Sequence, residues 1–133
     1  MRLLLDTHIL VWAVSHPVRL SPAVAAALAQ PENELWFSPV TAWELALLTE
    51  KGRIALATEV GVWMARAITS LSLREAPVNL AVALESRRLS AETSDPADRF
   101  IAATARIYEA VLVTADGKLK DLPGQHVLFN RKG

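Results

Sequence analysis

The chain has no cysteine, and this absence excludes several kinds of functional site at once. Disulfide scaffolds, thiolate zinc sites, iron–sulfur clusters and cysteine nucleophiles all need that side chain. Neither sign of charge is in excess, because 14 basic and 14 acidic side chains cancel. A basic excess is typical of proteins that attract nucleic acids through their overall charge, so any nucleic-acid contact here must depend on a local patch.

Long apolar runs are also missing from the sequence. No stretch approaches the ~18 uncharged apolar residues that a membrane span needs. Asp6 follows the first three leucines too soon for a secretory signal. We therefore expect a soluble, cytoplasmic protein without membrane contact. With 133 residues, 52% of them hydrophobic, residues 1–133 are expected to form a single domain with one buried core.

Short apolar runs alternate with longer helical patterns, which is typical of a parallel sheet covered by helices. The strands are expected at residues 3–5, 34–37, 73–78, 110–114 and 127–129. Ser-Pro or Asp-Pro pairs open three of the expected helices. The helices are expected over residues 8–14, 21–29, 38–51, 58–71, 80–89, 95–110 and 116–120, with a polar loop at 89–94. The predicted fold is a three-layer α/β/α sandwich around a roughly five-stranded parallel sheet.

Several acidic residues stand out because of where this pattern places them. Asp6 ends the first strand, Asp116 follows the strand at 110–114, and Asp98 lies in the first turn of a helix. Ligands of open parallel sheets bind at the carboxyl ends of the strands. Taken singly, each aspartate is explained better by helix capping or by its favourable position in a first turn. Glu44 has no such explanation, because it is the only charge in an apolar helical stretch, where burying a carboxylate costs free energy unless a cation or strong donors compensate.

Taken together, these acids predict one pocket for a hard divalent cation. Oxygen ligands without cysteine favour Mg²⁺ or Mn²⁺ over zinc. A water molecule held by such an ion can attack a phosphodiester. Without the ion, mutual repulsion is expected to raise the pKa of at least one carboxyl group. His8, His16 and His126 are not expected to take part in the chemistry. The expected catalytic and metal-binding residues are Asp6, Glu44, Asp98 and Asp116.

Four segments, in this order along the chain, resemble the motifs of PIN-domain nucleases, and most closely those of VapC-like toxin ribonucleases of bacterial type II toxin–antitoxin pairs. The segments are Leu3-Leu4-Leu5-Asp6-Thr7-His8, Ser38-Pro39-Val40-Thr41-Ala42-Trp43-Glu44-Leu45, residues 95–105 and Leu112-Val113-Thr114-Ala115-Asp116. The resemblance covers the whole chain. It implies a five-stranded parallel sheet between helices, Mg²⁺ or Mn²⁺ held by the four acids, endonucleolytic cleavage of RNA, a homodimer and a cognate antitoxin that blocks the pocket.

The resemblance also implies supporting roles and has two departures. Thr7, Ser38 and Thr114 would hold waters or orient the metal-binding carboxylates. Relatives often have a histidine where Thr93-Ser94 stands, and Ala97 replaces a commoner phenylalanine. Because neither departure touches the four acids, they concern packing rather than activity.

An RNA substrate would need positive charge around the acidic pocket, where phosphate contacts position the strand without reading its sequence. Each candidate can equally be an ordinary solvated surface charge. The candidates are Lys51, Arg53, Arg99, Lys118 and Lys120.

The four tryptophans are too many for one small core. Trp12, and Trp63 together with Met64, are expected to contact a partner subunit or an antitoxin helix. Core packing explains Trp36 and Trp43 at least as well.

Three other function classes fit the sequence less well. A catalytically silent module of the same fold would bind only RNA or protein, and the intact acidic set argues against it. A phosphoacceptor signalling domain needs an acidic pair at the end of the first strand, where Asp6 stands alone. A haloacid-dehalogenase-like phosphatase needs an aspartate at the position of His8.

Overall fold

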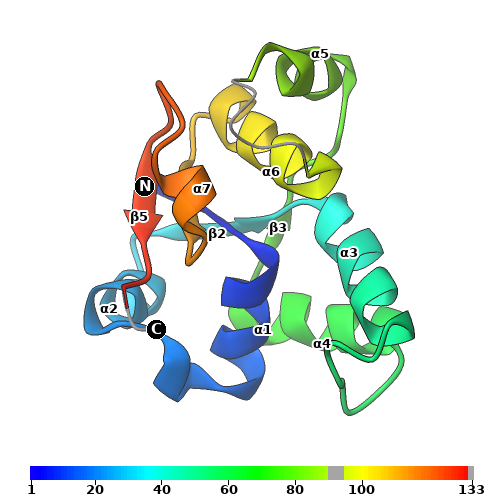
Figure 1. Cartoon of the computed structure of the whole chain (residues 1–133). Helices are drawn as coiled ribbons and strands as arrows, with labels where there is room; N and C mark the ends of the chain where they lie inside the picture. Colours follow the sequence, from blue (N-terminus) through cyan, green and yellow to red (C-terminus); the bar gives the residue numbers. More distant parts are fainter. Residues whose placement is uncertain (90–94, 132–133) are drawn as a thin grey trace.

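Five strands form one sheet in the order β3-β2-β1-β4-β5, and every pair of neighbours is parallel (Figure 1). The computed structural model describes residues 1–89 and 95–131, so most of the expected loop at 89–94, with Thr93 and Ser94, lies outside the described residues. The strands are β1 Arg2–Leu5, β2 Glu34–Phe37, β3 Arg74–Glu75, β4 Val111–Thr114 and β5 Val127–Phe129. The expected parallel sheet is therefore confirmed.

Helices pack on both faces of this sheet. They are α1 Thr7–Ser15, α2 Pro22–Ala29, α3 Pro39–Glu50, α4 Val60–Leu71, α5 Leu80–Arg88, α6 Pro96–Ile107 and α7 Gly117–Lys120, with a 3-10 turn at Pro17–Arg19. Figure 1 shows α1, α2 and α4 on one side of the sheet and α5 and α6 on the other. This arrangement confirms the three-layer α/β/α architecture.

The strand at the centre of the sheet supplies side chains to two cores. Side chains of successive strand residues point to opposite faces. Leu3 and Leu5 join a cluster with residues of α1, α2 and α4, whereas Leu4 joins a second cluster with Ile101 of α6 and Leu119 of α7. All of these leucines are almost completely buried. Because both faces of β1 are packed in this way, the strand is held between two helical layers. The packing therefore also fixes the position of the residue that follows its carboxyl end, Asp6.

The ends of the elements follow the sequence signals closely. Ser21, Ser38 and Asp95 cap α2, α3 and α6 through their side chains, and a proline follows each of them. The strand expected at 73–78 is shorter, because its neighbour β2 ends at Phe37, where Ser38 begins the turn into α3, and the last ladder hydrogen bond runs from the N–H of Ala76 to the carbonyl of Phe37. The helix expected to reach 110 ends at Ile107, and Glu109 turns the chain with a φ of 53°.

The expectation for the tryptophans was partly wrong. Trp63 and Met64 are each only 6% exposed and belong to the main core cluster, so they do not form a surface patch for a partner. Trp43 is instead 57% exposed. Trp36 packs against the second cluster, as expected.

Among residues 1–89 and 95–131, no helix combines the length and the apolar character needed to cross a bilayer.

Candidate active site

The carboxyl ends of β1 and β4 form the point where the order of the strands reverses. From β1 the chain runs outward to β2 and β3, and it then returns to β4 and β5 on the other side. Ligand sites of open α/β sheets lie in the crevice at such a reversal. Asp6 directly follows β1, and its backbone N–H donates a 2.9 Å hydrogen bond to the carbonyl of Val113 on β4. Asp116 follows β4 by two residues.

A cavity of about 360 Å³ opens at this edge, and five carboxylates line it. Its lining residues are Asp6, His8, Trp12, Glu44, Asp95, Asp98, Ala115, Asp116 and Lys118. All four acids predicted from the sequence therefore line one cavity. They come from the end of β1, the middle of α3, the start of α6 and the end of β4.

Thr114 links two of these carboxylates. Its hydroxyl Oγ1 donates a 2.7 Å hydrogen bond to Oδ2 of Asp6 and accepts a 3.0 Å hydrogen bond from the backbone N–H of Asp116. The other carboxylate oxygen of Asp6, Oδ1, accepts from the backbone N–H of Thr7 at 2.8 Å. Thr114 is fully buried and Asp6 is 6% exposed, so both oxygens of Asp6 are held in fixed positions.

Burial raises the pKa of three of the acids that line the cavity. Burial raises the pKa of Asp6, and hydrogen bonds from Thr114 and Thr7 oppose the rise. Burial also raises the pKa of Glu44, against a hydrogen bond from the Thr7 side chain. The pKa of Asp98 rises to about 8, first through burial and then through the charges of Asp6 and Asp95. The expected raised carboxyl pKa is thus present at Asp98.

Glu44, Asp95 and Asp98 form the tightest group, because one carboxylate oxygen from each lies within 4.8 Å of the others. Asp95 also caps α6 and accepts from the backbone N–H groups of Ala97 at 2.9 Å and Asp98 at 3.3 Å. Sequence reasoning assigned Asp95 to the cap alone and missed its place in the cavity. The available signal was the three-residue spacing from Asp98, which puts both acids at the same end of α6.

The predicted supporting residues fall into two groups. Thr7 and Thr114 are buried beside the carboxylates, and Thr7 Oγ1 also lies 3.1 Å from Oγ1 of Thr41. Ser38 is buried at the start of α3, where its hydroxyl accepts from the backbone N–H of Val40, and it is not among the described residues that line the cavity. Ser38 thus sets the start of the helix that carries Glu44.

The structure places the predicted RNA-contacting cations in different surroundings. Lys118 lines the acidic cavity. Lys51 and Arg53 are exposed at the far end of α3. Arg99 donates 3.0 Å hydrogen bonds to the carbonyls of Ser86 and Leu89, so it holds α5 to α6 instead of presenting a surface charge at the cavity. Lys120 stacks over an aromatic ring on the β5 side.

Two aromatic residues of α1 form part of the cavity wall. The rings of His8 and Trp12 lie 6.0 Å apart, and the guanidinium of Arg19 stacks 4.5 Å from the centre of the Trp12 ring. Both residues line the cavity together with the acids, although sequence reasoning set His8 aside. The charge of His8 opposes the rise in the pKa of Asp6 and Glu44.

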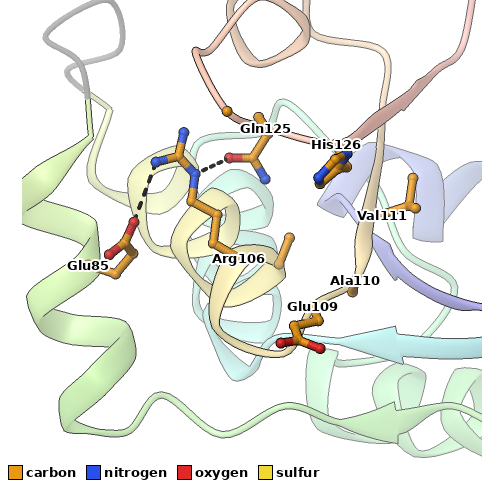
Figure 2. Close-up of a pocket in the computed structure, with 9 residues that line it drawn as sticks. Glu85, Arg106, Glu109, Ala110, Val111, Gln125 and His126 are labelled. Atoms are coloured by element: carbon orange, nitrogen blue, oxygen red, sulfur yellow. Dashed lines mark hydrogen bonds and ion pairs between the residues drawn. The ribbon is translucent and has the colours of Figure 1, made fainter.

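A second cavity, of about 620 Å³, lies at the starts of β4 and β5 and has a different character (Figure 2). Arg106 is the central charge, and its guanidinium is already satisfied by Gln125 at 2.7 Å, Pro123 at 2.6 Å and Glu85 at 3.4 Å. These contacts tie α6 to α5 and to the loop before β5. The acidic cavity is the better candidate site because its charges do not neutralise one another.

Comparisons with known proteins find a family model, a curated relative and solved structures that are similar to this chain. The PIN domain family model matches residues 3–125. Ribonuclease VapC22 of Mycobacterium tuberculosis is 37% identical over 120 residues, which cover 88% of each chain. The crystal structure of VapBC2 from Rickettsia felis, bound to a DNA fragment from their promoter, superposes with a TM-score of 0.71 at 21% identity and covers 98% of this chain and 99% of that one. The structure of VapBC-5 from M. tuberculosis, a member of the VapBC family of toxin-antitoxin systems, gives 0.61 at 20% identity, with 97% of each chain covered.

Proposed function

Because the chain belongs to the PIN-domain family, we propose that it is a metal-dependent endoribonuclease that acts as the toxin of a type II toxin–antitoxin pair. Its similarity to a protein named as a VapC ribonuclease supports this activity. The observation that carries the proposal is the meeting of five carboxylates in one cavity at the carboxyl ends of β1 and β4. Residues 1–133 would form one nuclease domain.

The cavity fits a divalent cation such as Mg²⁺ or Mn²⁺. Its donors are carboxylate oxygens, which both ions prefer. Oxygens of Glu44, Asp95 and Asp98 already lie within 4.8 Å of one another, and a cation would relieve their mutual repulsion. We assign Asp6, Glu44, Asp98 and Asp116 as ligands or water-mediated ligands, and we add Asp95 to the group.

The chemistry of such a site needs no nucleophilic side chain. A bound ion would supply electrophilic stabilisation of the phosphodiester and a water molecule of lowered pKa. The protein's own part is to orient: Thr114 and Thr7 hold both oxygens of Asp6, and Thr7 also contacts Glu44. Asp98, with its pKa near 8, keeps a proton on its carboxyl group at neutral pH and would release it when a cation binds. Lys118 offers positive charge to the substrate at the rim.

We further propose a cognate antitoxin that covers the acidic cavity, and a homodimer. The fold similarity to a VapBC toxin-antitoxin protein supports the antitoxin. Trp12 is half-buried in the cavity wall and keeps its assignment as a partner contact. Trp43 takes the place of Trp63 as an exposed apolar residue for a partner, at 57% exposure. A toxin that acts on RNA would work in the cytoplasm.

The activity is tested by incubating the purified protein with structured RNAs and Mg²⁺ or Mn²⁺, with and without EDTA. Cleavage should require the metal and should be lost in Asp6→Asn and Asp98→Asn. Asp121→Asn is a matched control, because this exposed aspartate ends α7 and does not line the cavity. Cleavage that persists in EDTA, or in both active-site variants, contradicts the mechanism.

The biological role is tested separately. Expression of the chain alone should inhibit growth, and expression of Asp98→Asn should not. Co-expression with the product of a neighbouring antitoxin gene should restore growth. Harmless expression of a folded, active protein would contradict the toxin assignment while leaving the nuclease assignment in place.

A further inference from the structure

A basic and aromatic patch lies next to the acidic cavity on the same edge of the sheet. We call it the Phe129 patch, and it consists of Lys120, Phe129 and Arg131. Phe129 is the last residue of β5, and it pairs with Thr114, the last residue of β4. Since Thr114 holds Asp6, the patch begins one strand away from the carboxylates.

Two cations of the patch lie over one aromatic ring. Nζ of Lys120 is 5.0 Å from the centre of the Phe129 ring, and Cζ of Arg131 is 5.7 Å from it. Both cations are exposed, and within residues 1–89 and 95–131 neither forms an ion pair with a carboxylate. Arg106, by contrast, is paired with Glu85. The positive charge of the patch is therefore available to an anion.

The patch borders a cavity of about 680 Å³, whose other wall includes Ser21 and Pro22 at the start of α2. The ring of Phe129 is half-buried but belongs to neither core cluster of the described residues. Its neighbours are the two cations and the cavity. The ring is thus placed as a contact surface rather than as core packing.

Helix α7 connects the patch to the acidic cavity. Lys118 lines the acidic cavity, and Lys120, two residues further along, lines the cavity beside Phe129. A strand of nucleic acid whose scissile phosphate sat among the carboxylates would find positive charge at this short helix. Phosphate contacts of this kind position a strand without reading its sequence.

We propose that the Phe129 patch is a subsite for a nucleotide of single-stranded RNA that flanks the scissile phosphate. The base stacks on Phe129, and the neighbouring phosphates contact Lys120 and Arg131. Exposed cation–π contacts are weaker than base–aromatic stacking, so a base can displace the cations from the ring toward the phosphates. This inference rests on the proposed nuclease function and specifies how its substrate is held.

A protein strand is the main competing occupant, because β5 is an edge strand of the sheet and an extended peptide can add to such an edge. Two observations favour a polyanion instead. Both cations lie on the aromatic ring, and the patch continues through Lys118 into a cavity suited to a metal and a phosphate.

Binding is tested in an Asp98→Asn background, so that the probe is not cleaved. The probe is a fluorescein-labelled single-stranded RNA of mixed sequence, and fluorescence anisotropy gives its affinity. Phe129→Leu keeps an apolar side chain without the ring and should weaken binding by about 5- to 100-fold, whereas Phe129→Tyr should retain it. Lys120→Ala and Arg131→Ala should each reduce the slope of log affinity against log salt by about 0.7.

Arg66→Ala, an exposed arginine of α4 that lies outside the patch, is the matched control and should leave affinity and salt slope unchanged. Far-ultraviolet circular dichroism and thermal unfolding establish that each variant is folded. Unchanged RNA affinity in folded Phe129→Leu and Lys120→Ala overturns the subsite. Loss of antitoxin binding with RNA affinity retained also overturns it, because the patch is then a protein contact.

Metal-dependent cleavage, measured with the same substitutions in the native background, separates the two proposals. A raised KM in Phe129→Leu with little change in kcat supports the subsite. Normal cleavage by the patch variants, with cleavage lost in Asp6→Asn, means that the nuclease assignment holds and the subsite is wrong. Patch-dependent binding without cleavage by the native chain in either metal means that the subsite holds and the nuclease assignment is wrong.

Discussion

The hydroxyl of Thr114 donates a 2.7 Å hydrogen bond to the carboxylate of Asp6, across 108 positions of sequence. The same oxygen accepts from the backbone N–H of Asp116 at 3.0 Å. One buried side chain therefore fixes two acids that follow neighbouring strands, and the geometry of the acidic cavity depends on it.

Thr114→Val keeps the shape of the side chain and removes this hydroxyl. We expect the apparent affinity for Mg²⁺ in the cleavage assay to fall by about 10- to 100-fold, because Asp6 loses its orienting partner. The free energy of unfolding should fall by about 1.5–3 kcal/mol, since the lost hydrogen bond is to a carboxylate. Thr104→Val, which removes another buried hydroxyl bonded to the carbonyl of Phe100, should lower stability without changing the metal dependence. An unchanged Mg²⁺ requirement in Thr114→Val would contradict the orienting role.

The raised pKa of Asp98 predicts how stability depends on pH. The ordinary pKa is 3.8 and the folded value is about 8, so between these values the folded protein keeps a proton that the unfolded chain has lost. The free energy of unfolding in EDTA should therefore fall as the pH rises through this window, and the dependence should flatten above it. Asp98→Asn should reduce the slope without abolishing it, because Asp6 and Glu44 are shifted in the same direction. Urea unfolding at several pH values measures this, and a slope identical in the variant would rule out the assignment.

Asp95 has two roles that different substitutions can separate. Asparagine caps helices about as well as aspartate, so Asp95→Asn should keep the stability of the metal-free protein but weaken metal binding. Asp95→Ala should weaken metal binding and also lose about 1 kcal/mol of stability through the missing cap of α6. Thermal unfolding in EDTA and Mg²⁺ titration of cleavage report the two effects independently. If Asp95→Asn needs no more Mg²⁺ than the native chain, Asp95 is only a cap.

A bound metal should stabilise the folded chain, and Glu44 tests this. At 100 times the dissociation constant, a ligand adds about 2.7 kcal/mol to the free energy of unfolding. Glu44→Gln removes a carboxylate whose pKa is raised by burial and by the charges of Asp6 and Asp95. We expect this variant to be more stable than the native chain in EDTA at pH 8, and to gain little stability from Mg²⁺. Calorimetry with and without the metal is the measurement, and an undiminished gain from Mg²⁺ in Glu44→Gln would contradict the site.

The different burial of two tryptophans predicts effects of different size on stability. Trp63→Ala should cost about 3–5 kcal/mol, as large-to-small substitutions of core aromatic residues do. Trp43→Ala, at a residue 57% exposed, should change the free energy of unfolding of the monomer by less than about 0.5 kcal/mol. Urea unfolding of both variants is sufficient, and comparable losses would contradict the placement of Trp43.

The sheet and most of its helices could be predicted from the sequence because local signals agree with the tertiary structure. β2 and β5 have the expected bounds, and the cap-and-proline pairs mark the starts of α2, α3 and α6. The predicted length of β3 was too great because its pairing stops where β2 ends at Phe37, and only contact with β2 makes Arg74–Glu75 a strand. An apolar helix such as α3 gives no periodic signal, so its exposed face, which carries Trp43, could not be identified.

The meeting of the four acids at one cavity could be predicted because they follow strands or occupy a helix where a buried charge costs free energy. The place of Asp95 in the cavity was missed because helix capping already accounts for an aspartate before a proline. The cap by itself gives no indication that the same side chain also lines a cavity. Trp63 was misplaced for a different reason. Its stripe on α4 is the ordinary core-facing pattern, whereas the high hydrophobic content of the chain favoured a partner surface.

Three of the cavity's carboxylates are also helix caps, since Asp6, Asp95 and Asp116 each accept hydrogen bonds from the first backbone N–H groups of α1, α6 and α7. These amides carry partial positive charge, so they offset some of the crowding of negative charge before any cation arrives. We therefore expect the chain to fold in the absence of metal, with the proposed metal-binding carboxylates already lining the cavity. Replacement of these aspartates by asparagine should yield an inactive but folded protein, suited to isolating a complex with the proposed antitoxin.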